Sequence, residues 1–266
     1  MKVNEGVTFM ILSGSGSYGV KSSDETVASV TLRDNYVDVL GESAGTATIT
    51  VSDTKSGQKK TIEVIVTDNT PSPGTSAEAV DLGLPSGTKW ADRNIGASSP
   101  EDYGGLYAWA MIEEIEVCGS YKWGYGEDGE LTKYCTNSKY GTVDNKTVLD
   151  PEDDVACVTW GGQWRMPTLE QAKELVANCD SEWTSLNGVW GRKYTSKNNG
   201  NSIFIPAAGY YAYGTYYSKD SKGFYWLSTL DEQNPERAYD LFLASGSTGT
   251  SANYRYHGCS VRPVTK

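Results

Sequence analysis

Short runs of alternating apolar and polar residues dominate the first quarter of the chain. They occupy residues 7–12, 27–32, 36–40, 45–51 and 61–66, and turn-forming residues such as Asp34-Asn35 and Ser56-Gly57 separate them. A period of two is typical of strands with one buried face, and short strands with regular turns favour a β-sandwich. Neither Trp nor Cys occurs before residue 69, so an antibody-type disulfide core is excluded.

A Pro- and Ser-containing segment at residues 69–78 follows these runs. Its two prolines and small polar residues are typical of a solvated, semi-rigid linker. We therefore predict two domains, an all-β immunoglobulin-like sandwich over residues 1–68 and an α+β domain over residues 79–266. All 8 tryptophans lie in the second of these.

The second domain mixes strand, helix and loop patterns. Strands are expected at residues 80–84, 88–91, 107–110 and 202–209, with a helix start at residues 99–102 and long polar loops at residues 113–154 and 210–222. The clearest helix follows Thr168, which forms a capping-box pattern with Gln171. Apolar residues recur there with helical spacing and define one buried stripe, namely Ala172, Leu175, Val176 and Cys179.

The last forty residues combine apolar blocks at 224–226, 239–243 and 261–264 with an aperiodic stretch at 244–259. Small polar residues with tyrosine are the composition that binding loops favour. We therefore predict that this stretch is a displayed binding surface, supported by the flanking strands and by the Tyr-rich loop before them. The candidate ligand-binding residues are Ala244, Ser247, Gly249, Ser251, Ala252, Asn253, Tyr254, Tyr256, His257 and Cys259, with Tyr211 and Tyr213 from the neighbouring loop.

Charge and rare residues exclude several kinds of function. The net charge of -11 argues against nucleic-acid binding, which needs clustered Lys and Arg. No apolar run is long enough to span a bilayer, and no signal-like segment opens the chain, whose strand-like residues 1–6 suggest a fragment. The 5 cysteines form no CxxC pair, which leaves buried free thiols or one disulfide, and the single His257 rules out multi-histidine metal sites.

The first domain resembles the bacterial immunoglobulin-like (group 2) family. The resemblance rests on the segments SSDETVASV at residues 22–30 and AGTATITV at residues 44–51, and it covers nearly the whole domain. Such domains serve as spacers or adhesion modules of bacterial and phage surface proteins. The resemblance therefore implies a spacer role for residues 1–68.

The second domain resembles the FISUMP ("major paralogous") family, which has a C-type-lectin-like fold. Five motifs in the family's order carry the resemblance: VDLGLPSGTKWA at 80–91, WRMPT at 164–168, FIPAAG at 204–209, YWLST at 225–229 and SVRPV at 260–264. Leu227 departs from the family, which often has Ser at that position. The resemblance implies that both ends of the domain meet in a small sheet and that the late strands build one exposed face.

A subset of such domains are variable proteins of diversity-generating retroelements, in which a segment before the SVR-like ending is rewritten at many codons. Residues 244–259 stand at that place, and their composition is similar to that left by replacement of Asn codons. The resemblance thus implies a non-catalytic protein that binds a cell-surface protein or glycan, without a cofactor. It would sit on a bacterial surface, outside the cell or on a phage virion. The alternatives are a structural or adhesive surface protein and an oxidase of the formylglycine-generating kind.

Three kinds of site chemistry have candidate residues in the chain, and for each of them an ordinary structural role is the expectation. Acidic residues at 150–154 and at 127–130 offer oxygen ligands for calcium, but they lack the EF-hand pattern and are expected to be solvated turns. The sugar-binding motifs of calcium-dependent lectins are absent, and Asn234-Pro235-Glu236 has the reverse order. His257 and Cys259 are two residues apart, a spacing that would share a strand face and suit nucleophilic catalysis, but it carries little meaning in a loop.

Overall fold

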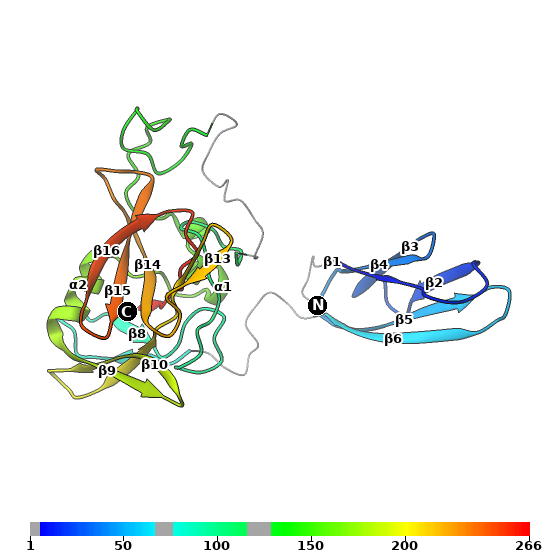
Figure 1. The fold of residues 1–266 in the computed structure, drawn as a ribbon, viewed down its shortest axis with the longest axis horizontal. Coiled ribbons are helices and arrows are strands. Elements are labelled where there is room, and N and C mark those ends of the chain that lie inside the picture. Colours follow the sequence, from blue (N-terminus) through cyan, green and yellow to red (C-terminus); the bar gives the residue numbers. More distant parts are fainter. Residues whose placement is uncertain (1–5, 67–76, 116–128) are drawn as a thin grey trace. The chain divides into compact units, whose positions relative to one another are not determined.

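The computed structural model describes residues 6–66, 77–115 and 129–266. Cys118, most of the proposed linker and the acidic pair Glu127-Asp128 lie outside these ranges, as do residues 1–5. The chain divides into two compact units, Met1–Gly74 and Thr75–Lys266 (Figure 1). The described residues form seventeen strands, two α-helices and one short 3-10 helix, so the protein is mostly β.

The N-terminal unit consists of two three-stranded antiparallel sheets. One has the order β1-β4-β3, with β1 at Gly6–Met10, β4 at Tyr36–Gly41 and β3 at Ala28–Arg33. The other has the order β2-β5-β6, with β2 at Tyr18–Ser22, β5 at Gly45–Asp53 and β6 at Lys59–Val66. Their inner faces form one hydrophobic cluster that includes Val37, Val39 and Ile49. The alternating runs all became strands, whereas β2 was not predicted because its apolar contrast is weak.

The C-terminal unit begins and ends in the same small sheet. Strand β8 (Lys89–Ala91) lies between β7 (Ala79–Asp81) and β17 (Val264–Thr265), and Trp90 pairs with both Val80 and Val264. Trp90 is fully buried in the main core. Arg262, next to this sheet, donates from Nε to Asn94 Oδ1 at 2.7 Å and from its other nitrogens to backbone carbonyls. Arg262 therefore has an internal structural role.

The sheet that positions the candidate site has the order β14-β15-β16. It comprises β14 (Lys222–Leu230), β15 (Arg237–Ala244) and β16 (Thr248–Tyr254) (Figure 1). Helix α2 (Leu169–Asn178) packs its apolar stripe into the core cluster that also contains Leu241 and Leu243 of β15. Its capping box is present as predicted: the amide of Gln171 donates to Thr168 Oγ1, and the Gln171 side chain accepts from the amide of Thr168.

The remaining strands form two hairpin-based sheets that the sequence reasoning did not foresee. Strands β9 (Cys179–Leu186) and β10 (Val189–Ser196) turn at Asn187-Gly188, and β11 (Ser202–Pro206) completes that sheet. Asn187 and Gly188 both have positive φ, as a two-residue hairpin turn of this type requires. The Asn-Gly dipeptide is a sequence signal for such a hairpin, but the hairpin was not predicted. Within the expected loop at 210–222, β12 (Tyr210–Ala212) pairs with β13 (Thr215–Tyr217).

Two predicted elements are wrong. Residues 99–102 form a turn, because the Asp102 carboxylate accepts from the amide of Ser98 and the chain reverses at Gly104, whose φ is 66°. Residues 107–110 are not a strand: Tyr107 makes a single bridge to Cys259, and Ala110 has a φ of 69°.

Two short helices precede α2. They are a 3-10 turn at Pro151–Asp153 and α1 at Val155–Trp160, neither of which was predicted. In the parts that the structure describes, no helix combines the length and apolar character that a membrane crossing requires.

Candidate functional site

The stretch at residues 244–259 is a strand and a turn rather than the irregular loop that the sequence suggested. Ala244 ends β15, Ser247 lies in the connecting turn, and β16 carries five of the candidates: Gly249, Ser251, Ala252, Asn253 and Tyr254. All seven residues of β16 are half-buried. Helical or strand periodicity is absent from its sequence because both of its faces are partly covered.

The register with β15 divides the candidates between two faces of the sheet. Ser251 pairs with Asp240 and Asn253 pairs with Ala238, whereas Ala252 pairs with Tyr239 and Tyr254 with Arg237. Paired residues of an antiparallel ladder lie on the same face. The candidates on β16 therefore do not form one continuous surface, which corrects the prediction of a single displayed stretch.

An aromatic cluster brings together three candidate tyrosines and His257. Tyr213, which is 78% exposed at the turn of the β12–β13 hairpin, has its hydroxyl 2.5 Å from that of Tyr256. The Tyr254 and Tyr256 rings stack with centroids 5.3 Å apart, and the His257 ring lies 4.9 Å from that of Tyr256. We call Tyr213, Tyr254, Tyr256 and His257 the tyrosine cluster. Residues from two separate elements thus meet, as the prediction of a neighbouring loop required.

A second group of aromatic rings packs against the tyrosine cluster through Tyr210. Tyr210 lies 5.1 Å from His257 and 5.1 Å from Phe224, and Phe224 lies 5.3 Å from Phe242. Tyr217 stacks on Tyr210 at 5.2 Å. Phe224, which belongs to the apolar block at residues 224–226, is only half-buried. Tyr210, Tyr217 and Phe242 were not among the candidates, although the tyrosine content of residues 210–217 was the available signal.

Arg237 was also missed, and it lies against the exposed end of the cluster. Its guanidinium carbon lies 4.5 Å from the centroid of the Tyr254 ring, which is a cation–π geometry. The Tyr254 side chain raises the pKa of Arg237, chiefly by accepting a hydrogen bond from its guanidinium. Arg237 therefore holds one face of Tyr254 and gives this end of the site a positive charge.

His257 is a buried part of the cluster rather than a displayed contact. Its side chain is 8% exposed, and burial together with the charge of Arg237 lowers its pKa to about 4. Its Nδ1 atom has no hydrogen-bond partner among the described residues. At neutral pH the ring is therefore uncharged.

A buried carboxylate lies beneath two of the candidates. Asp240, in the middle of β15, is fully buried and accepts from Ser251 Oγ at 2.7 Å and from Asn253 Nδ2 at 2.8 Å. Burial raises its pKa to about 6, and the two hydrogen bonds oppose that rise. Ser251 and Asn253 are therefore the partners of Asp240, so each has an internal role besides any contact with a ligand.

The remaining candidate at the end of the stretch is a core residue. Cys259 is fully buried, and burial followed by the nearby Asp240 raises the pKa of its thiol well above the ordinary value. Arg255, which was not a candidate, is also fully buried. It lies 4.9 Å from the Trp109 ring and donates to the carbonyl of Pro235 at 3.1 Å. These two residues anchor the segment and are not available to a ligand.

Thiol chemistry at this place is disfavoured by the same burial. A nucleophilic or metal-binding cysteine acts as the thiolate, which low dielectric surroundings destabilise. Cys135, Cys157, Cys179 and Cys259 all carry free thiols. The spacing of His257 and Cys259 therefore does not produce an activated pair.

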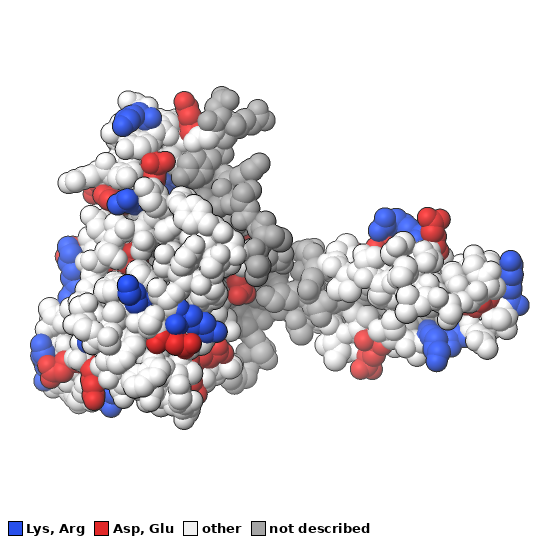
Figure 2. All heavy atoms as spheres, in the orientation of Figure 1, with Lys and Arg blue, Asp and Glu red and all other residues white. Residues whose placement is uncertain are grey.

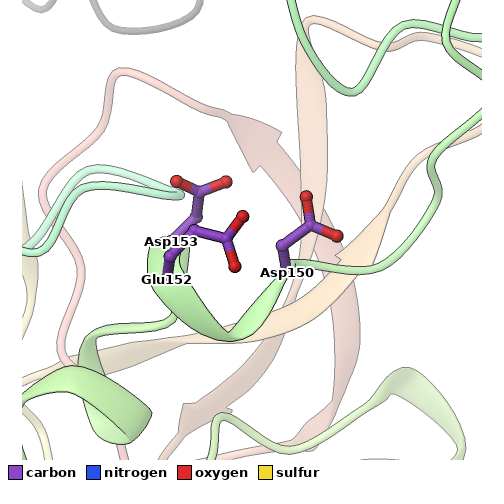
Figure 3. Close-up of side chains that lie close together, drawn as sticks. All are labelled: Asp150, Glu152 and Asp153. Atoms are coloured by element: carbon purple, nitrogen blue, oxygen red, sulfur yellow. The ribbon is translucent and has the colours of Figure 1, made fainter.

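Lysine side chains form ion pairs with acidic residues of the 150–154 stretch. Asp150, Glu152 and Asp153 come close together, as Figure 3 shows. Lys133 Nζ lies 2.9 Å from Asp150 and also bridges to Asp153, and Lys146 Nζ lies 2.5 Å from Asp150. Asp154 instead caps α1, because it accepts from the amides of Ala156 and Met166. The two lysines therefore already neutralise part of the negative charge of these carboxylates.

Comparison with known proteins identifies no family. No protein-family model matches the chain, and no curated protein matches it. Among solved structures, domains 5-6 of the S-layer protein SbsC are 12% identical, with 95% of this chain and 90% of that chain covered and a TM-score of 0.22. Domains 4-9 of the same protein are 14% identical over 95% of this chain and 29% of that one, with a TM-score of 0.21. TM-scores of this size do not indicate a shared fold.

Proposed function

We propose that the protein is a non-catalytic binding protein of a bacterial or phage surface. In this proposal the C-terminal unit has a C-type-lectin-like fold and recognises a protein or glycan on a cell surface through its tyrosine cluster. The N-terminal sandwich acts as a spacer. The segment 244–259 is the diversified part of a retroelement variable protein.

The observation that carries the proposal is the construction of the tyrosine cluster. Tyrosines present large, stiff contact area with a polar tip, and such residues dominate the energy of binding interfaces. Here Tyr213, Tyr254 and Tyr256 come from two elements and pack against the buried His257 ring. Such packing fixes the exposed Tyr213 and the half-buried Tyr254 and Tyr256, which reduces the entropy lost on binding.

Two further features support the individual parts of the proposal. Both ends of the C-terminal unit meet in the β7-β8-β17 sheet, which is the arrangement that the C-type-lectin resemblance implies. The buried Cys259 weighs against the oxidase alternative, because its thiol is held in the protonated form.

The test uses the full chain on a glycan array and on an array of random-sequence peptides. Tyr254→Ala and Tyr256→Ala are expected to weaken binding at least about tenfold each, as removal of a hot-spot residue does. Tyr36→Ala, which removes a 44% exposed tyrosine of the N-terminal unit, is the matched control and should leave binding unchanged. Equal binding by all four proteins, or no ligand on either array, would contradict the proposal.

Diversification is tested separately. Sequences of the same locus from related isolates should differ mainly at residues 244–259. Within that segment Arg255 and Cys259 should stay constant, since both are fully buried. Differences spread evenly over the chain would refute the retroelement assignment and leave the binding role to be judged by the arrays.

A further inference from the structure

Strand β16 has an unpaired edge that faces away from β15. Two hydrogen bonds at the ends of the β15–β16 ladder show which residues bond across it. The amide of Ala244 donates to Ser247 O at 2.9 Å, and the amide of Arg255 donates to Glu236 O at 3.0 Å. In an antiparallel ladder only every second residue of an edge strand bonds to its neighbour. The register then directs the peptide groups of Thr248, Thr250 and Ala252 outwards. Tyr254 has the same phase, but its carbonyl already accepts from the amide of His257, so it is not grouped with these three.

These outward peptide groups have no partner within the described ranges. No backbone bond of the turns and loops reaches them, and β16 pairs with β15 alone. All three residues are half-buried rather than enclosed. Their N–H and C=O groups therefore form a row of vacant donors and acceptors, spaced by two residues or about 6.8 Å.

Strand β16 also lacks the charges and prolines that normally prevent an edge strand from pairing with another chain, and α2 packs closely against this strand. Natural edge strands are blunted by charges, especially lysine, by proline or by bulges. The other outer strands of the two larger sheets in this unit carry such residues: Lys222 in β14, Asp180 and Glu182 in β9, and Pro206 in β11. Strand β16 has neither a charge nor a proline over its seven residues. The surface over this sheet is largely uncharged in Figure 2.

We propose that β16 receives an extended strand of a protein partner, which becomes the fourth strand of the β14-β15-β16 sheet. This inference rests on the proposed function and names the class of ligand, a polypeptide rather than a glycan. A second strand matches the outward row because its own peptide groups repeat with the same spacing, whereas sugar hydroxyls do not.

The arrangement also explains how a binding segment tolerates changes of sequence. Main-chain hydrogen bonds supply affinity that does not depend on side chains, and the side chains along the strand supply specificity. Gly249, Ser251 and Asn253 bond to β15 through their backbone, so substitutions there leave the outward row intact. Tyr254, held by Arg237 at 4.5 Å, closes one end of the edge with a ring on which the added strand can pack.

The test begins with linear peptides of about twelve residues selected from the random-sequence array, with affinities for the full chain measured by fluorescence anisotropy. Thr250→Pro removes one outward N–H and places a ring on the edge, and it is expected to weaken binding at least about tenfold. Thr250→Val is the matched control, because it keeps the N–H and the shape of the side chain, and should bind within about twofold of the unchanged chain.

N-methylation of the peptide gives a second readout that does not depend on folding of a variant. Methyl groups at alternate residues should abolish binding, and methyl groups at the intervening residues should be tolerated, because only one side of the added strand faces β16. Loss at every position, or at none, would overturn the proposal.

Other results separate this inference from the proposed function. Binding to glycans alone, still dependent on Tyr254 and Tyr256, would overturn strand addition and leave the proposed function standing. Binding of peptides that Thr250→Pro does not weaken would also overturn it. Sedimentation that shows self-association lost in Thr250→Pro would assign the edge to a second copy of the chain and refute a foreign partner.

Discussion

Replacing Asp240 with Asn should change how the stability of the C-terminal unit depends on pH. The native pKa of Asp240 is raised to about 6 from the model-compound value of 3.8, chiefly by burial. Below about pH 3 the carboxyl is protonated in both the native and the unfolded chain, and its ionisation costs nothing. As the pH rises towards 6, the unfolded chain releases the proton while the native chain retains it, so the native state loses stability.

The size of this effect follows from the pKa difference. At about 1.36 kcal/mol for each pH unit, the rise from 3.8 to about 6 corresponds to about 3 kcal/mol above pH 6. Asp240→Asn removes the ionisation and retains the hydrogen bonds, since its amide can accept from Asn253 and donate to Ser251. The free energy of unfolding of Asp240→Asn relative to the unchanged chain should therefore increase by about 3 kcal/mol from about pH 3 to about pH 7.

Intrinsic fluorescence during urea unfolding is a suitable assay, because all 8 tryptophans lie after residue 78 and report on the C-terminal unit. Asp180→Asn is the control, since that side chain is 83% exposed, and its effect should be equal at each pH. If the difference in free energy of unfolding between Asp240→Asn and the unchanged chain is constant within about 0.5 kcal/mol over this pH range, ionisation of Asp240 does not destabilise the native state.

His257 should produce the opposite dependence in the same pH range. Burial and Arg237 lower its pKa from 6.5 to about 4, so its contribution is complete above pH 6.5 and is lost as the pH falls towards 4. The two groups therefore offset one another in the unchanged chain. In Asp240→Asn the effect of His257 is no longer offset. The free energy of unfolding of this variant should fall by about 2–3 kcal/mol between about pH 7 and about pH 4.

Three further predictions concern the anchors of the site. Arg255→Met should lower the free energy of unfolding by about 3–5 kcal/mol in the fluorescence assay, because buried carbonyls lose a charged donor, whereas the half-buried Arg165→Met should cost less than about 1 kcal/mol. Thr168→Ala should cost about 1 kcal/mol through loss of the capping box of α2, and no change in the midpoint would contradict that. In the native protein a thiol reagent should modify the half-buried Cys157 before the fully buried Cys259, and mass spectrometry of peptides would reveal the reverse order.

The elements that could be predicted are those whose sequence records a local cause. Helix α2 was predicted with its cap, because Thr168 and Gln171 satisfy each other within one turn. Five strands of the N-terminal unit follow from alternation, since each has one face in the core. The β9–β10 hairpin also carried a local signal, Asn187-Gly188, which was not used.

The candidate site was harder because its causes are distant in the sequence. Strand β16 shows no alternation, because the residues on both of its faces are half-buried. The burial of Arg255 depends on carbonyls of residues 133, 134 and 235 that the fold brings to it. Composition identified tyrosines correctly as members of the cluster, but it could not separate displayed side chains from those that support them.

The order Tyr254-Arg255-Tyr256 shows why that separation needs the structure. The central arginine is fully buried while the rings on either side stack on one another at 5.3 Å. The chain leaves β16 here and turns, with the amide of His257 donating to Tyr254 O at 2.9 Å. The turn leaves both tyrosines half-buried and directs the residue between them into the core. The buried arginine therefore fixes where the two rings stand, so a change at position 255 should disturb binding through Tyr254 and Tyr256 without touching the ligand.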